Sequence, residues 1–264
     1  MKMKLLTIAA MMIPVASNAA ILPLDETQKS EISTNLVSHT LSEEAAKNIE
    51  ESSFYNVLGK VESFKDLYAI EKDGEFIFSN KAGDVIIDGE VYDLKNEVSV
   101  TQQAKQLIAK PILASIAPDD VVVFESKLEE TKGILYVFSD PTCHYCVKLH
   151  GEFDELNRQG FEIRVVPFVR SLEHRLSEDK TLKNIEIMGI ADKVTQLAEY
   201  KKLINSKSVE VDKSNLTDDG FNKVKDGYVK GRKLGLRGTP MIMNAEGKSI
   251  EGYSDANRII DTLF

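Results

Sequence analysis

The stretch from residue 121 to residue 169 constrains the fold of this chain more than any other. It contains the apolar runs VVVFES, GILYVFSD and FEIRVVPFV, with a helical stretch from Cys143 to about Asn157 between the second run and the third. An apolar strand that leads into a helix and then into another apolar strand is typical of a β-α-β unit with a parallel sheet. The sequence therefore predicts an α/β domain in the C-terminal half of the chain.

The residues after this unit predict a helical insertion and a closing hairpin. Residues 171–235 are mostly charged and have a helical pattern, and they end just before Arg237-Gly238-Thr239-Pro240. The next segment, MIMNAEGKSIEGYS, predicts a hairpin that turns at residues 244–247. The last segment, ANRIIDTLF, predicts a closing helix.

The N-terminal part of the chain has two different patterns. Residues 25–52 are charged and favour helix, with apolar side chains at Ile32, Leu36, Leu41 and Ala45, and they predict one or two short helices. Residues 54–94 contain the segments LYAIE, EFIFS, DVIID and EVYDL, separated by turn signals such as Asp-Gly. This alternation predicts a small antiparallel sheet.

The segment VSVTQQAKQLIAKPILASIA lies between these two parts and predicts a helix. Good helix formers follow Thr101, with Leu107 and Ile108 on one face, and Pro111 is expected to end or kink the helix. The helix either links two domains, with Pro111 as the bend, or packs on one domain only.

The first twenty residues have the layout of a secretory signal peptide. Lys2 and Lys4 precede an apolar run from Leu5 to Val15, and small residues follow up to a cleavage site after Ala19 or Ala20. This run is too short to span a bilayer, so the sequence argues against a retained membrane anchor. Without Lys2 and Lys4 the net charge changes from −9 to −11, which disfavours nucleic-acid binding.

The two cysteines of the chain, Cys143 and Cys146, are separated by two residues. A haem attachment site needs a histidine directly after the second cysteine, where this chain has Val147. A structural zinc site needs four ligands, and the histidines of the chain do not form the required spaced pair. A disulfide across such a short loop constrains the unfolded chain very little. Haem, zinc and a structural disulfide are all disfavoured, and no metal or cofactor is expected.

A redox pair agrees best with the position of the cysteines. Cys143 follows an apolar strand at the expected start of a helix, with Thr142 as the expected N-cap, and the helix N-terminus favours a thiolate there. Cys146 lies deeper, against the sheet. A protonated His144 would stabilise the Cys143 thiolate further, although an exposed histidine without a chemical role is the alternative.

Thr239-Pro240 is the second candidate element of the site. X-Pro bonds are cis in only about 5% of cases in folded proteins. This proline nevertheless precedes an expected strand, where the Thr239 backbone can be exposed beside the cysteines.

These motifs together resemble the thioredoxin fold, and the whole mature chain resembles the DsbC/DsbG family of periplasmic disulfide isomerases. The resemblance is carried by FSDPTCHYCVKLH, GDVIIDGEVYDL and RGTPMIM. It implies a V-shaped homodimer that is joined through the N-terminal domains, with Cys143 as nucleophile, Cys146 as resolving cysteine and Thr239-Pro240 as the cis-proline pair. His144 and Tyr145 are then active-site neighbours. His144-Tyr145 replaces the Gly-Tyr or Pro-Tyr that is typical of the family, and the second, structural disulfide of some members is absent.

The resemblance also implies an organisation, a location and partners. The expected fold is an α+β N-terminal dimerisation domain, a helical linker and an α/β thioredoxin-fold catalytic domain with a helical insertion. The protein is expected in the periplasm, acting on misfolded exported proteins with non-native disulfides and reduced by a membrane electron donor of the DsbD type. A dithiol oxidase and a holdase chaperone or partner-binding module are the alternatives. The expected boundaries are a signal peptide at 1–19, the dimerisation domain at 20–96, the linker at 97–114, and the catalytic domain at 115–264 with its insertion at about 171–235.

Overall fold

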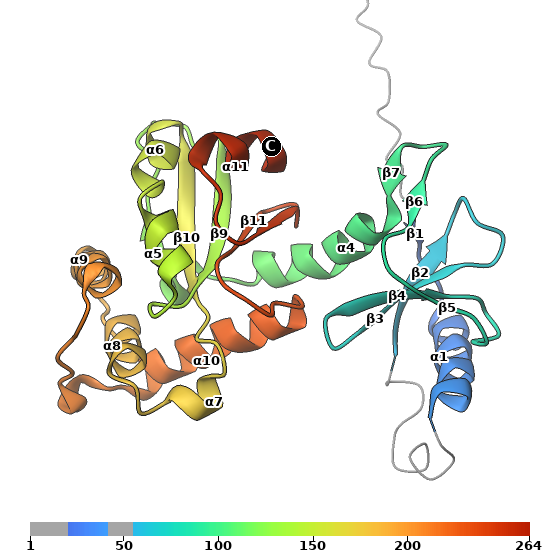
Figure 1. Cartoon of the computed structure of the whole chain (residues 1–264), viewed down its shortest axis with the longest axis horizontal. Helices are drawn as coiled ribbons and strands as arrows, with labels where there is room; N and C mark the ends of the chain where they lie inside the picture. Colours follow the sequence, from blue (N-terminus) through green and yellow to red (C-terminus); the bar gives the residue numbers. More distant parts are fainter. Residues whose placement is uncertain (1–20, 42–54) are drawn as a thin grey trace, which may run out of the picture.

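A computed structural model describes residues 21–41 and 55–264, which form two five-stranded sheets joined by one helix, and a separate two-stranded sheet (Figure 1). The expected signal peptide and Ala45 lie outside the described residues. In Figure 1 the two sheets lie near opposite ends of helix α4 (Val100–Ala114). Within the described ranges, no helix is long and apolar enough to cross a membrane.

The N-terminal sheet is antiparallel, as the sequence predicts, and has the strand order β1-β2-β3-β4-β5. Helix α1 (Glu26–Thr40) packs on it through Ile32, Leu36 and Val37. The strands β1 and β2 were not predicted, whereas EVYDL pairs outside this sheet, as β6 with β7. The strands are β1 (Ile21–Leu22), β2 (Asn56–Val61), β3 (Tyr68–Lys72), β4 (Glu75–Ser79), β5 (Ile86–Asp88), β6 (Tyr92–Asp93) and β7 (Val98–Ser99).

Helix α4 contributes side chains to the cores of both halves. Val100 and Ala104 pack into a core with residues of the N-terminal sheet, whereas Ala109 and Leu113 pack into a core with residues of the second sheet. Of the two expected effects of Pro111, an end of the helix is wrong, because the helix continues to Ala114 and Pro111 is exposed on it. Leu107 is also exposed, because the buried residues of the helix are Val100, Thr101, Ala104, Ala109 and Leu113.

The second sheet contains the predicted β-α-β unit and has the strand order β12-β11-β9-β10-β8. Strands β9 and β10 are parallel, while every other neighbouring pair in this sheet is antiparallel. The sheet is therefore mixed, which corrects the expectation of a parallel sheet. Its strands are β8 (Val122–Phe124), β9 (Gly133–Ser139), β10 (Phe161–Pro167), β11 (Met241–Asn244) and β12 (Ser249–Glu251).

Both faces of β9 are buried, which explains why its sequence is a continuous apolar run. Leu135 and Val137 face one core, and Tyr136 and Phe138 face the other. The predicted hairpin is confirmed, since β11 pairs with β12 around a turn at residues 244–248.

Helices surround this sheet at the positions that the sequence predicts. The helix after Cys143 is broken at residues 151–152 into α5 (His144–His150) and α6 (Phe153–Arg158). Four α-helices occupy the expected insertion between β10 and β11, and a closing helix follows β12. They are α7 (Leu172–Arg175), α8 (Asp179–Met188), α9 (Lys193–Asn205), α10 (Asp218–Lys233) and α11 (Ala256–Leu263).

Candidate active site

Cys143 lies at the junction between strand β9 and helix α5. Its peptide N–H donates to the carbonyl of Asp140 at 3.0 Å, and its own carbonyl accepts the N–H groups of Cys146 and Val147, each at 3.1 Å. Cys143 is itself the N-cap residue, so the expectation that Thr142 caps the helix is wrong. The Thr142 hydroxyl instead donates to Asp140 at 2.6 Å. The Cys143 sulfur thus lies at the positive end of the helix.

The sequence-distant Thr239-Pro240 pair lies beside Cys143. Strand β11 pairs with β9, with Met241 opposite Phe138, and this pairing brings the residues before β11 to the end of β9. The Thr239-Pro240 peptide bond is cis. The Cys143 thiol donates to the Thr239 carbonyl at an Sγ–O distance of 3.2 Å, although the two residues are 96 positions apart.

The pKa of the Cys143 thiol is lowered from its usual value of 9.0. Burial alone would raise this pKa, but hydrogen bonds from Thr239, from Cys146 and from the Tyr145 N–H outweigh it. The N–H groups of Tyr145 and Cys146 lie at the first turn of α5, where they stabilise a negative sulfur. Cys143 is 5% exposed, so only a small part of the residue reaches the surface.

The other thiol has the opposite character. Cys146 is fully buried, and both cysteines are free thiols in this structure. Burial raises the pKa of Cys146 to about 12, despite hydrogen bonds from the Asp140 backbone and the Ser139 side chain. The pair therefore combines one ionisable thiol near the surface with one protonated thiol in the core. This asymmetry suits attack on an external disulfide by the first sulfur and a later attack by the second.

His144 and Tyr145 occupy the first turn of α5 and are both exposed. Their rings contact each other edge to face, with centroids 5.8 Å apart. The side chains of these two residues therefore lie at the surface next to Cys143, where an incoming substrate would meet them. The effect of His144 on the Cys143 thiolate remains a prediction.

The buried carboxylate of Asp140, in the loop that precedes Cys143, was not predicted from the sequence. The Asp140 side chain is completely buried, and it forms ion pairs with Arg170 at 3.0 Å and with Arg175 at 2.9 Å. Burial opposes ionisation of Asp140, but hydrogen bonds from Thr142 and Arg170 outweigh it and lower the pKa. Arg175 also donates to the Thr142 hydroxyl at 2.6 Å. The helical insertion thereby holds the loop that precedes Cys143.

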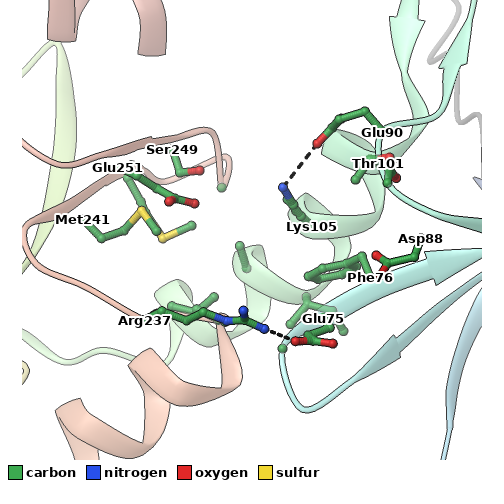
Figure 2. Close-up of a pocket in the computed structure, with 18 residues that line it drawn as sticks. Glu75, Phe76, Asp88, Glu90, Thr101, Lys105, Arg237, Met241, Ser249 and Glu251 are labelled. Carbon is green, nitrogen blue, oxygen red and sulfur yellow. Dashed lines mark hydrogen bonds and ion pairs between the residues drawn. The ribbon is translucent and has the colours of Figure 1, made fainter. Parts of the chain in front are cut away.

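A cavity of about 410 Å³ lies between the N-terminal sheet and the catalytic half, and the cysteines do not line it. Figure 2 shows Phe76 and Asp88 on one side of it and Met241 and Glu251 on the other. At one end Arg237 forms an ion pair with Glu75. The cavity is therefore separate from the thiols, although Arg237 lies only two residues before Thr239.

His150, at the end of helix α5, has a buried imidazole ring. Its Nε2 atom is buried without a hydrogen-bond partner in the described structure, and its ring centroid lies 4.2 Å from that of Phe153. Burial lowers the pKa of His150 from 6.5 to about 3. Below pH 6.5 the unfolded chain therefore binds a proton that the folded protein does not.

We expect the free energy of unfolding to fall as the pH drops from 6.5 towards 3, with His150 contributing about 1.4 kcal/mol for each pH unit. A His150→Phe variant should lose this contribution, so its pH dependence should be shallower. Urea unfolding at several pH values measures the difference. A His174→Gln variant is the control, because the side chain of His174 is 80% exposed. Parallel curves for wild type and His150→Phe would contradict the buried neutral histidine.

Comparisons with known proteins identify the family of the chain. The family model described as a thioredoxin-like domain matches residues 123–264, which is more than half of the chain. The thiol:disulfide interchange protein DsbC of Haemophilus influenzae is 28% identical over 218 residues, covering 81% of this chain and 87% of the relative. The protein of the same name from Escherichia coli K12 is 28% identical over 181 residues, covering 69% and 70%. The catalytic domain of Proteus mirabilis ScsC has 17% identity and a TM-score of 0.48, and the match covers 60% of this chain and 95% of that domain.

Proposed function

Because the chain belongs to the thioredoxin-like family and is a thiol-disulfide oxidoreductase of the DsbC type, we propose that it isomerises or reduces non-native disulfides in exported proteins through Cys143 and Cys146. The observation that carries the proposal is the asymmetry of the two thiols. The pKa of Cys143 is lowered near the surface, and that of Cys146 is raised in the core.

In the proposed reaction the Cys143 thiolate attacks one sulfur of a substrate disulfide. A mixed disulfide forms between Cys143 and the substrate, and the other substrate sulfur leaves as a thiolate. A substrate thiolate can then attack the mixed disulfide, which rearranges the substrate and returns Cys143 as a thiolate. Alternatively, Cys146 attacks Cys143, which releases the substrate reduced and leaves the enzyme with a Cys143–Cys146 disulfide. The second route consumes two electrons, so we propose a membrane electron donor of the DsbD type in the periplasm.

The balance between isomerase and oxidase can be tested with two substrates. The mature protein should restore activity to a disulfide-scrambled ribonuclease in a glutathione buffer, and its oxidised form should introduce disulfides into the fully reduced ribonuclease more slowly. The reason is that oxidation begins when a substrate thiolate attacks Cys143 in the Cys143–Cys146 disulfide, and Cys146, whose raised pKa makes it a poor leaving group, must then leave. Faster oxidation than rearrangement would favour a dithiol oxidase instead.

We also propose that two copies of the chain pair through their N-terminal sheets. Strand β5 forms one edge of the sheet, and Val85, Ile86 and Ile87 are 49%, 44% and 40% exposed there. An apolar edge strand of this kind invites pairing with another strand. Pairing across a two-fold axis would cover both edges at once.

An Ile87→Lys variant should shift the protein from dimer to monomer, because it places a charge on each copy at the proposed contact. Light scattering of the mature protein measures the change, and the monomer should rearrange scrambled ribonuclease poorly while still reducing disulfides. Leu107→Lys is the matched control, since Leu107 is an exposed apolar residue on α4 and not on this edge. A wild-type protein that scatters as a monomer contradicts this assembly.

A further inference from the structure

The turn between strands β3 and β4 of the N-terminal sheet contacts the catalytic half of the chain. Gly74 lies in this turn, and a Cβ built on it would lie 2.7 Å from the Gly235 nitrogen and 2.9 Å from the Arg232 carbonyl oxygen, at the end of helix α10. Gly74 and Gly235 also have positive φ angles, of 80° and 75°. A side chain at either position would therefore strain the backbone and push the two segments apart.

An ion pair beside this turn holds the segment that leads to Thr239-Pro240. Glu75, the first residue of β4, pairs with Arg237, and Figure 2 shows their side chains pointing toward each other across one end of the cavity. Leu236, between Gly235 and Arg237, is buried in the core of the second sheet. The β3–β4 hairpin therefore contacts the chain on both sides of a buried anchor.

The same segment continues to the reactive thiol. Two residues after Arg237, the Thr239 carbonyl accepts the Cys143 thiol at an Sγ–O distance of 3.2 Å. Met241 then begins β11, which pairs with β9. A Cβ built on Gly238 would meet no atom of the described structure within 4 Å, so no neighbouring segment packs on the loop at that point. Thr239 thus lies between a point that the hairpin holds and a point that the sheet holds.

We propose that the β3–β4 hairpin positions the Thr239 carbonyl against Cys143, and that contact with the N-terminal half thereby favours the dithiol form of the enzyme over the disulfide form. This inference rests on the proposed function, because it takes Cys143 and Cys146 as the redox pair. The hydrogen bond from Cys143 to Thr239 exists only in the dithiol form, since a Cys143–Cys146 disulfide has no proton to donate. The dithiol is the form that attacks a substrate disulfide.

The equilibrium of the full mature protein with glutathione measures this preference. In this reaction Cys143 and Cys146 lose two electrons and two protons and form their disulfide, while one glutathione disulfide gains them and becomes two glutathione molecules. We expect Glu75→Arg to increase the equilibrium constant for disulfide formation by about 2- to 5-fold, because a second cation beside Arg237 displaces the loop and weakens a hydrogen bond of the dithiol form. Adding Arg237→Glu restores an ion pair with the charges exchanged and should return the constant to the wild-type value.

Glycine variants test the backbone contact independently of charge. Gly74→Ala should also increase the constant. Its control is Gly83→Ala, because Gly83 has a φ of 75° as well, but a Cβ there would meet the backbone of helix α1 within the N-terminal half. The control for Glu75→Arg is Glu31→Arg, which breaks the exposed ion pair of Glu31 with Lys81 in the same half. Neither control should change the constant.

The outcomes separate this inference from a general loss of stability and from the proposed function. An unchanged constant in Glu75→Arg overturns the inference, and so does an increase that the addition of Arg237→Glu fails to reverse. Equal constants in Gly74→Ala and Gly83→Ala overturn it as well. If Gly74→Ala does not fold, the charge variants at exposed positions decide alone. A wild-type protein that forms no Cys143–Cys146 disulfide with glutathione would instead overturn the proposed function.

Discussion

A Cys143→Ser variant should lose essentially all thiol-disulfide exchange while keeping its fold. Only a thiolate attacks a disulfide at a useful rate, and a serine hydroxyl does not replace it. Cys146 cannot compensate, because burial raises its pKa to about 12 and keeps it protonated at pH 7. Its sulfur is also fully buried, whereas a substrate disulfide must reach the attacking atom.

The measurement is the rate of reduction of a small disulfide and of rearrangement of scrambled ribonuclease. Cys146→Ser is the matched control, since it keeps the attacking thiol and removes the resolving one. It should form mixed disulfides that accumulate on a non-reducing gel. The rate of attack in the wild type should increase with pH up to the lowered pKa of Cys143 and then level off below the usual value of 9.0. Thiol-disulfide exchange that persists in Cys143→Ser would contradict the assignment of Cys143 as the nucleophile.

The same variant separates the enzyme from the alternative class of protein. A holdase chaperone binds unfolded substrates through apolar surface, and a change of one sulfur to oxygen leaves that surface intact. Suppression of aggregation by Cys143→Ser, in the absence of exchange, would show a binding activity that is independent of the thiols. Loss of both activities together would tie binding to the mixed disulfide.

The β-α-β unit was predictable because its strands are buried on both faces. Residues of β9 alternate between two cores, so the run GILYVFSD has no polar gap. An apolar run does not reveal its direction, which is why the antiparallel pairing of β8 with β10 was missed. Strand β2 was missed for a different reason. Its Gly59 interrupts the pattern: the pairing with β3 shifts register between Val57 and Gly59, and a Cβ at Gly59 would lie 2.3 Å from the Leu22 carbonyl oxygen of β1.

The candidate site was predictable only where its residues form local sequence patterns. The spacing of Cys143 and Cys146 and the Thr-Pro before a strand are local signals, and the structure brings them together. Arg175 pairs with Asp140 across 35 positions and Tyr200 with Ser139 across 61 positions, and no local pattern indicates such contacts. The one available signal was Asp140 itself, a charged residue directly after a strand that is buried on both faces.

Removing both arginines that pair with Asp140 should destabilise the fold more than any other change at the surface of this site. In the wild type the buried carboxylate accepts hydrogen bonds from the Thr142 N–H and hydroxyl, the Arg170 N–H and side chain, and Arg175. A buried charge that loses its partners costs about 3–5 kcal/mol. We therefore expect Arg170→Met with Arg175→Met to lower the free energy of unfolding by about that amount at pH 7.

The pH dependence of stability should also change sign between the two proteins. In the wild type the pKa of Asp140 is lowered from 3.8, so its contribution is present above that pH and is lost as the pH falls through the folded value. In the double variant the Thr142 donors and the N–H of residue 170 remain, but both cations are lost, and burial, the largest contribution, should then raise the pKa above 3.8. The folded variant then retains a proton that the unfolded chain has lost, and its stability should decrease as the pH rises from about 4 to 7.

Urea unfolding of both proteins between pH 4 and 7 measures the difference, because the Asp140 contribution is nearly constant over that range in the wild type and decreases with rising pH in the double variant. The control is Arg158→Met with Arg258→Met, which removes the same charge from exposed positions. Adding Asp140→Asn to the first pair should recover most of the lost stability, because the neutral amide still accepts from Thr142 and no longer needs a cation. If the double variant is as stable as its control, the ion pairs of Asp140 contribute nothing. If it is unstable and the third change fails to rescue it, the lost stability comes from the packing of the arginine side chains and not from an unpaired charge.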